Sequence, residues 1–303
     1  MSLSLPIHLQ SWARTDDADV EALRDVRFTP PEQADLRLDI YRPVGQEGPL
    51  PVVLYLHGGG WRVGSRTDRE RDRQIPLARL GFAVVSADYR LSGDARFPAQ
   101  LDDSARALRW ILGNGDAVGL DVSRVAVAGA SAGAHLAALL ALAGADGEGL
   151  PIPPVQAIVS WFPVTDVAGY DAEWRSAPWP EPDTFAAQGA AKRGWPPAER
   201  VAALLGVAHV EDADPAAVAA ADPRSYLAAA SARRTAPFLI LHGDRDTAVG
   251  VHHARLLHDA LRQHGIATTL LVLADADHED AAFGRPAPLG AVAHFLRQAL
   301  LVR

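Results

Sequence analysis

Apolar residues in this chain gather in short runs that alternate with longer segments of helical periodicity. Seven runs have the length and the β-branched or aromatic content of strands, and Gly, Pro, Asp or Arg bounds them. They cover residues 36–41, 52–56, 82–86, 125–128, 157–162, 238–241 and 269–273. The first alternates apolar and polar positions, whereas the later ones are largely apolar throughout, as in strands that are buried on both faces.

Helical spacing of apolar residues follows several of these runs. It is clearest over residues 101–112, 136–142, 251–264 and 290–301. Buried strands that are each followed by a helix predict the α/β class. We expect a mainly parallel central sheet with helices on both faces.

One stretch, residues 167–234, interrupts this alternation. It is rich in Pro, Trp, Ala and Asp and contains no clear strand. Because a structureless loop of that length is improbable in a compact domain, we predict a small helical cap insertion within a single domain of residues 1–303. Its Trp174, Trp179 and Trp195 would form part of the pocket wall or the packed core of a lid.

A serine lies at the junction between one buried run and the helical segment after it. The stretch Gly129-Ala-Ser-Ala-Gly133 has the pattern G-x-S-x-G and comes directly after residues 125–128. Small flanking residues permit a sharp turn that exposes the Ser131 hydroxyl, and the helix start offers N–H groups to a developing anion. This position makes Ser131 the predicted nucleophile; an ordinary Ala/Gly/Ser helix start is the alternative.

Three consecutive glycines follow the second run, in His57-Gly-Gly-Gly-Trp61. Lacking Cβ atoms, they let backbone N–H groups approach a ligand closely. We expect them to bind the oxyanion of a tetrahedral intermediate together with the N–H of Ala132. Trp61 would line the substrate pocket, with plain packing as an equal alternative. The pattern matches neither a P-loop nor a dinucleotide fingerprint.

Two aspartates and a histidine follow the last two runs and are candidates for the acid and the base. Asp244 and Asp246 come after residues 238–241, and either could orient a histidine or cap the next helix. His278 lies just past the final run, whereas His242 precedes a glycine turn and is expected to be structural. The resulting chain order of Ser, Asp and His is the one expected for this fold.

Charge and composition exclude several other classes of protein. A net charge of −8 disfavours a nucleic-acid partner, because phosphate binding needs a concentrated basic surface. Without cysteine there is no thiolate metal site, and His252 and His253 are not expected to bind a metal because adjacent helical residues diverge. We therefore predict no metal and no organic cofactor. The absence of a signal peptide and of a long apolar stretch predicts a cytoplasmic protein with no membrane span, and a homodimer is left open.

Five separated motifs resemble those of the hormone-sensitive-lipase-like and feruloyl-esterase-like carboxylesterases. They are HGGGW at 57–61, DYRLS at 88–92, FPAQLDDSARALRWI at 97–111, GASAGAHLA at 129–137 and LHGDRDTAV at 241–249. The resemblance implies a catalytic triad and an oxyanion hole. Their residues are Ser131 as nucleophile, Asp246 rather than Asp244 as acid, His278 as base, and Gly59, Gly60 and Ala132 as oxyanion donors. The chain departs from the family at Asp275, Asp277, Glu279 and Asp280, because small residues often surround the family's histidine.

The expected reaction is hydrolysis of a small or short-acyl carboxylic ester through an acyl-enzyme. The GASAGAH stretch is also similar to kynurenine formamidases, so hydrolysis of an N-formyl amide by the same triad is the nearest alternative. A non-catalytic ligand-binding protein of the same fold is the more distant one. A full candidate triad argues against it.

Overall fold

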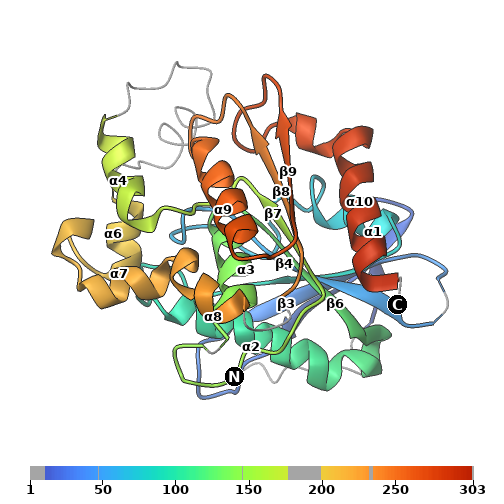
Figure 1. Cartoon of the computed structure of the whole chain (residues 1–303). Helices are drawn as coiled ribbons and strands as arrows, with labels where there is room; N and C mark the ends of the chain where they lie inside the picture. The colour runs from blue at the N-terminus through green and yellow to red at the C-terminus, as the bar shows by residue number, and fades with distance from the viewer. Residues whose placement is uncertain (1–10, 47, 145, 177–198, 232–234, 302–303) are drawn as a thin grey trace.

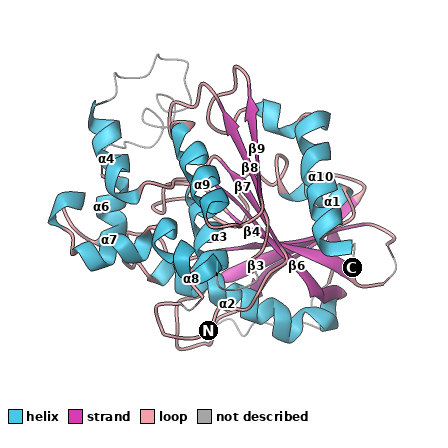
Figure 2. Cartoon of the chain, viewed as in Figure 1, coloured by secondary structure: helices cyan, strands magenta, loops and turns pink. Residues whose placement is uncertain are grey.

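A single twisted sheet forms the centre of the molecule, with helices on both faces (Figures 1 and 2). The computed structural model describes residues 11–46, 48–144, 146–176, 199–231 and 235–301. Within these residues the strands are β1 (Ala13–Arg14), β2 (Val20–Arg27), β3 (Arg37–Pro43), β4 (Leu50–Leu56), β5 (Ala83–Ala87), β6 (Leu120–Ala130), β7 (Ala157–Trp161), β8 (Phe238–Gly243) and β9 (Thr268–Leu273).

The strands lie in the order β1-β2-β3-β5-β4-β6-β7-β8-β9. The pairs among β1, β2, β3 and β5 are antiparallel, and every pair from β5 through β4 to β9 is parallel. The carboxyl ends of the parallel strands therefore meet at one edge of the sheet, where ligand sites of open α/β sheets lie. The predicted class, a mainly parallel sheet covered on both faces, is confirmed.

Two hydrophobic clusters fill the spaces between the sheet and its helices. One cluster packs α2 (Ala99–Asn114), α3 (Ala132–Leu142) and α9 (His252–Gln263) against one face. The other packs α1 (Gln74–Arg79) and α10 (Pro286–Leu301) against the opposite face. All seven side chains of β4 are buried, because this strand lies near the middle of the sheet with helices on either side.

All seven runs that were expected to be strands are strands, but the two-residue strand β1 and the longer β2 were not predicted. The sequence of β2, VEALRDVR, alternates only as far as Ala22, because Leu23 is buried as well, and then two exposed residues follow in succession. Asp25 has φ 60°, and the pairing with β3 shifts register between Leu23 and Val26. This irregularity is a β-bulge, which destroys the period of two that would have marked the strand.

The described part of the segment that connects β7 to β8 contains helices joined by loops, and no strand. It contains α4 (Val167–Ser176), α6 (Arg200–Leu205), η3 (Val210–Asp212), α7 (Pro215–Ala221), η4 (Pro223–Tyr226) and α8 (Leu227–Ser231). These elements lie at one side of the sheet, beside α3 and α9 (Figure 1). Of the tryptophans expected to matter here, Trp174 is on α4, whereas Trp179 and Trp195 are outside the described residues.

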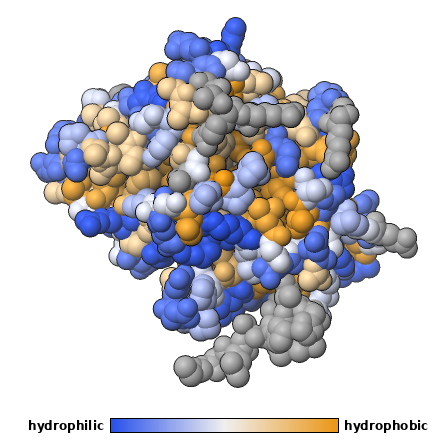
Figure 3. All heavy atoms as spheres, turned by 60° about the horizontal axis from the view of Figure 1, so that its bottom comes forward, coloured by the Kyte–Doolittle hydropathy of each residue, from blue (hydrophilic) through white to orange (hydrophobic). Residues whose placement is uncertain are grey.

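Few of the large apolar side chains are well exposed on the surface. Among the described residues these are Leu150, Val272 and Leu301, on a loop, on the edge strand β9 and at the end of α10. On the face in Figure 3, hydrophobic residues gather in patches surrounded by hydrophilic ones. No described helix combines the length and the apolar character that crossing a bilayer requires.

Gly290 tests the contribution of helix propensity to stability. It is an exposed residue of α10, and a Cβ added to it would meet no atom within 4 Å. Gly290→Ala should raise the free energy of unfolding by about 0.5–1 kcal/mol, because glycine loses more backbone freedom than alanine in a helix. Urea denaturation measures this change, and a loss of stability would contradict the open surroundings of Gly290.

Candidate active site

Ser131 occupies a strained turn between β6 and α3. Its φ of 54° and ψ of −116° lie outside the regions that residues with side chains ordinarily adopt, at a cost of about 1–3 kcal/mol. The Ser131 N–H donates to the carbonyl of Trp161, 2.9 Å away, and this bond attaches the turn to the end of the neighbouring strand β7. Ser131 is only 7% exposed.

Two glycines make this turn sterically feasible. A Cβ on Gly129 would lie 2.2 Å from the carbonyl oxygen of Gly133, across the turn. A Cβ on Gly133 would lie 2.0 Å from the carbonyl oxygen of Leu56 and 2.6 Å from that of His57. The first turn of α3 thus packs directly on the backbone that ends β4, and this contact brings Ser131 beside the glycine-rich loop.

The glycine-rich loop has a backbone shape that only glycine adopts easily. Gly59 and Gly60 have φ of 117° and 59°, and a Cβ on Gly59 would lie 2.1 Å from the carbonyl oxygen of Val63. Tyr89 holds the start of the loop: its hydroxyl donates to the His57 carbonyl at 2.9 Å, and its ring stacks on the imidazole of His57 at 4.2 Å.

The backbone N–H groups of Gly59, Gly60 and Ala132 have no acceptor within the part of the chain that the structure describes. Ala132 is the first residue of α3, where N–H groups have no partner inside the helix. Three unpartnered donors at adjacent strand ends are what an oxyanion site requires.

Asp246 lies after β8 and its carboxylate is saturated with hydrogen bonds. Oδ1 accepts from the N–H groups of Ala248 at 2.9 Å and Val249 at 2.7 Å. Oδ2 lies 2.8 Å from Nδ1 of His278 and 3.2 Å from Nε2 of His242. The side chain of Asp246 is completely buried, so these four contacts replace its hydration.

These contacts determine the charge of Asp246. Burial alone would raise its pKa, but the charge of His278 and the hydrogen bonds from His242 and His278 outweigh burial and lower the pKa well below its ordinary value. Asp246 is therefore ionised at neutral pH. Asp244, the competing residue, instead accepts a hydrogen bond from the N–H of Asp275 and serves the turn.

His278 lies between Asp246 and the aromatic residue that follows β7. The centroids of its imidazole and of the Phe162 ring are 4.4 Å apart, and His278 is 5% exposed. Because Nδ1 faces a carboxylate, it carries the hydrogen of the neutral ring, and Nε2 is the basic nitrogen.

The surroundings of Gly58 show that the loop carrying His278 and Glu279 lies close to Ser131. A Cβ added there would lie 3.5 Å from Ser131 Cβ and 3.6 Å from Oε1 of Glu279, the residue after His278.

The acidic residues around His278 have partners of their own. Glu279 forms an ion pair of 2.9 Å with Arg73, and both side chains are buried. Asp275 pairs with Arg245 at 2.6 Å. Asp277 accepts from Thr247, and Asp280 caps the turn at Ala282.

Arg73 and Phe162 were not anticipated from the sequence. The Arg73 guanidinium lies over the rings of Trp161, Phe162 and Phe283, at 5.2–5.9 Å. The only available signal for Phe162 was its place at the end of a buried run. Nothing in the charged stretch around Arg73 distinguishes this arginine from its exposed neighbours.

Trp61 is completely buried and packs against His135 rather than lining an open surface. Its Nε1 donates to Nδ1 of His135 at 3.2 Å, and the two rings meet edge to face. Nε2 of His135 lies 2.7 Å from the carbonyl oxygen of Ala221 at the end of α7. These contacts favour the packing alternative for Trp61, and His135 joins the glycine loop to the segment between β7 and β8.

Two histidines outside this site converge on one carboxylate, contrary to the expectation that they would diverge. Nε2 of His252 and Nε2 of His253 lie 3.0 Å and 3.2 Å from the two carboxylate oxygens of Glu173. The expectation was wrong because these residues begin α9 and α4 supplies Glu173 between them. Nδ1 of His253 accepts the N–H groups of Thr165 and Asp166, so Nε2 carries the ring hydrogen. A metal ligand needs a lone pair at that atom, so the geometry fits a hydrogen-bonded pair better than a metal site.

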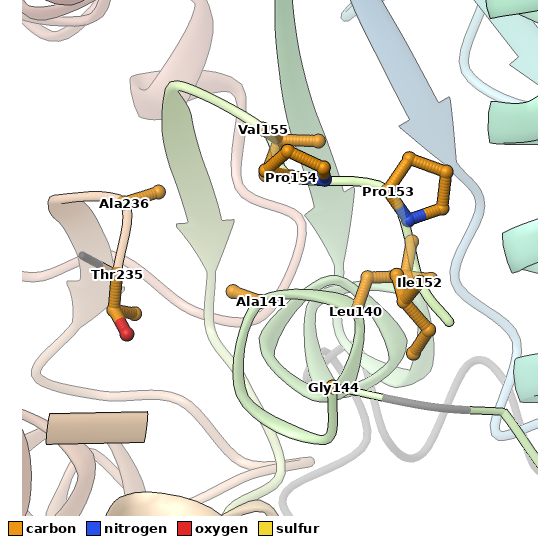
Figure 4. A pocket seen from close by; sticks show the side chains of 9 residues that line it. All are labelled: Leu140, Ala141, Gly144, Ile152, Pro153, Pro154, Val155, Thr235 and Ala236. Carbon is orange, nitrogen blue, oxygen red and sulfur yellow. The ribbon is translucent and has the colours of Figure 1, made fainter. Parts of the chain in front are cut away.

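The pocket in Figure 4 is separate from the candidate active site. It lies beside the last turn of α3, and Leu140, Gly144, Ile152 and Thr235 are among its lining residues. Ser131 precedes the opposite end of the same eleven-residue helix, about 16 Å away at 1.5 Å per residue.

The parallel sheet, the serine turn and the Asp–His pair at its carboxyl edge define an α/β-hydrolase. The BD-FAE family model matches residues 38–261. The ethyl acetate hydrolase of Pseudomonas putida is 30% identical over 282 residues, which cover 88% of this chain and 77% of that protein. The chain therefore belongs to the BD-FAE family.

Two further relatives extend the comparison. The carboxylesterase NlhH of Mycobacterium tuberculosis is 39% identical over 131 residues, which cover 43% of this chain but only 40% of that protein's length. The crystal structure of the esterase LipW from Mycobacterium marinum superposes with a TM-score of 0.67 at 27% identity. That match covers 93% of this chain and 82% of LipW.

Gly133→Ala tests the contact between the serine turn and β4. We expect the free energy of unfolding to fall by about 3 kcal/mol or more, because the added methyl group overlaps the carbonyl oxygens of Leu56 and His57. Urea denaturation measures the loss, with Gly290→Ala as the matched control. Equal stability of the two variants would refute the close contact.

His135 should make stability depend on pH. Burial lowers the pKa of His135 to about 4, against an ordinary value of 6.5. The unfolded chain therefore binds a proton before the folded one does. The associated stability is complete above pH 6.5 and declines as the pH falls toward 4, by about 2 kcal/mol between pH 7 and pH 5.

His135→Gln should lack this part of the pH dependence. The comparison is the change in the free energy of unfolding from pH 7 to pH 5, measured in urea for both proteins. Other histidines contribute equally to the two proteins and cancel. The same change in both would show that His135 is not held neutral.

Proposed function

We propose that this protein is a serine carboxylesterase that hydrolyses small or short-acyl carboxylic esters. The observation that carries the proposal is the buried contact between Asp246 and His278, at the strand ends that also present Ser131 and three unpartnered N–H groups. The names of the relatives agree with this reaction, since they are a carboxylesterase, an ethyl acetate hydrolase and an esterase.

In the proposed first step, His278 takes the proton of Ser131 as the serine oxygen attacks the ester carbonyl. The N–H groups of Gly59, Gly60 and Ala132 hold the negative charge that develops on the carbonyl oxygen. Asp246 keeps the imidazole oriented and stabilises its protonated form. His278 then gives the proton to the leaving alcohol, and an acyl group remains on Ser131.

The second step repeats this chemistry with water. His278 removes a proton from a water molecule, whose oxygen attacks the acyl carbon; the imidazolium returns the proton to Ser131 as the acid leaves. The reaction needs no group beyond these side chains and amides. Residues 167–234 would act as a cap over the site within one domain. The cytoplasmic location and a homodimer stay predictions.

A fluorophosphonate probe tests the nucleophile. The wild-type protein should be labelled. Ser131→Ala should not be labelled, and its kcat for p-nitrophenyl acetate should fall by at least about a thousandfold. Ser104→Ala is the matched control, because Ser104 is also buried but donates within α2. Labelling of Ser131→Ala at the wild-type rate would exclude Ser131 as the nucleophile.

The same assay separates the ester from the amide reaction. The proposal expects a higher kcat/KM for p-nitrophenyl acetate than for N-formylkynurenine. The reverse order would assign the triad to formamide hydrolysis, and turnover of neither by a correctly folded protein would favour a binding role.

A further inference from the structure

Helix α4 makes two hydrogen bonds to the loop that carries the candidate acid. The Tyr170 hydroxyl and Nε1 of Trp174 both donate to the carbonyl oxygen of Ala248, at 3.0 Å and 2.8 Å. Tyr170 is 2% exposed, and burial raises the pKa of its phenol, so the hydroxyl keeps its hydrogen.

The carbonyl that receives these bonds shares a peptide group with a donor to Asp246. The C=O of Ala248 and the N–H of Val249 belong to one peptide unit, and that N–H donates to Oδ1 of Asp246 at 2.7 Å. Hydrogen bonds in a chain polarise one another, so two donors on the carbonyl strengthen the N–H at the other end. The opposite oxygen of Asp246 is the one that contacts His278.

A cation in the same segment reinforces both donors. Arg200, the first residue of α6, donates from Nη1 to the Tyr170 hydroxyl at 2.9 Å, and its guanidinium lies 4.7 Å from the ring of Trp174. The positive charge favours donation by Tyr170 to the next acceptor. The order of contacts is therefore Arg200, Tyr170, the peptide between Ala248 and Val249, and Asp246.

Further contacts fix α4 on the same loop. His253 accepts the N–H groups of Thr165 and Asp166, which precede α4, and Glu173 of α4 meets the histidines that begin α9. Helix α4 is thus attached along its length to residues 248–253, directly after the acid.

We propose that Tyr170 and Trp174 are positioning residues for the catalytic acid. They act through the peptide between Ala248 and Val249, which they hold and polarise so that Asp246 stays aligned with His278. This inference rests on the proposed function, because it gives Asp246 the role of the acid. Neither residue needs to touch the substrate for this effect.

The test removes the two donors and leaves an aromatic ring at each position. Tyr170→Phe and Trp174→Phe together should lower kcat on p-nitrophenyl acetate by about tenfold and leave KM unchanged. The reason is the loss of both hydrogen bonds to the Ala248 carbonyl, in the loop that carries Asp246. Tyr226→Phe is the matched control, since the Tyr226 hydroxyl donates to the carbonyl of Ala220 in the same segment, at 2.8 Å. The control should keep the wild-type kcat.

The same substitutions in an Asp246→Ala background show whether the effect passes through the acid. There the double substitution should change the residual kcat by less than about twofold, since its target is gone. A tenfold loss in both backgrounds would overturn the proposal in favour of general structural support. An unchanged kcat in the wild-type background, or a raised KM alone, would also overturn it.

Two controls keep the result interpretable. If the double variant does not fold by circular dichroism, each single variant is measured in the same two backgrounds, with about a threefold loss expected only where Asp246 is present. An inactive wild-type protein, or an Asp246→Ala variant with full activity, would instead count against the proposed function.

Discussion

The contact between Gly133 and the backbone at the end of β4 is the constraint on which the site depends. Because β4 and β6 are parallel neighbours, with Leu56 opposite Gly129, their following loops leave the sheet at the same level. The missing side chain at Gly133 then lets α3 begin against the carbonyl oxygens of Leu56 and His57. This backbone packing sets how close the Ser131 turn lies to the N–H groups of the glycine-rich loop.

The backbone has positive φ at four of the five strand ends that contribute to the site, and the end of β8, which carries Asp246, is the exception. Trp61 after β4, Ser131 after β6, Phe162 after β7 and Glu279 after β9 all have positive φ, from 40° to 58°. Such conformations persist only where surrounding contacts compensate for them. Here the compensation includes the bond from Ser131 to Trp161 and the buried pair of Arg73 and Glu279. The packed surroundings therefore hold these residues in backbone conformations that an isolated loop would not keep.

The sequence predicted the sheet well because its strands are buried on both faces and read as continuous apolar runs. It failed at β2, where a bulge at Asp25 breaks the alternation. The predicted pairing of Asp246 with His278 matches the contact observed, and the choice over Asp244 needed the resemblance to a family rather than local pattern. Long-range partners such as Arg73 for Glu279, or Tyr170 for Ala248, join segments far apart in the chain. No local periodicity encodes such pairs, so they could not have been predicted.

The attachment of α4 changes where the segment between β7 and β8 can be divided. By sequence α4 opens that segment, but by its contacts with Ala248, His252 and His253 it belongs with residues 246–253, the loop that carries Asp246. A chimaera that exchanges the segment between relatives should therefore keep Val167–Ser176 from the same parent as residues 246–253. The natural junction for such a graft comes after Ser176, one helix later than the chain order suggests.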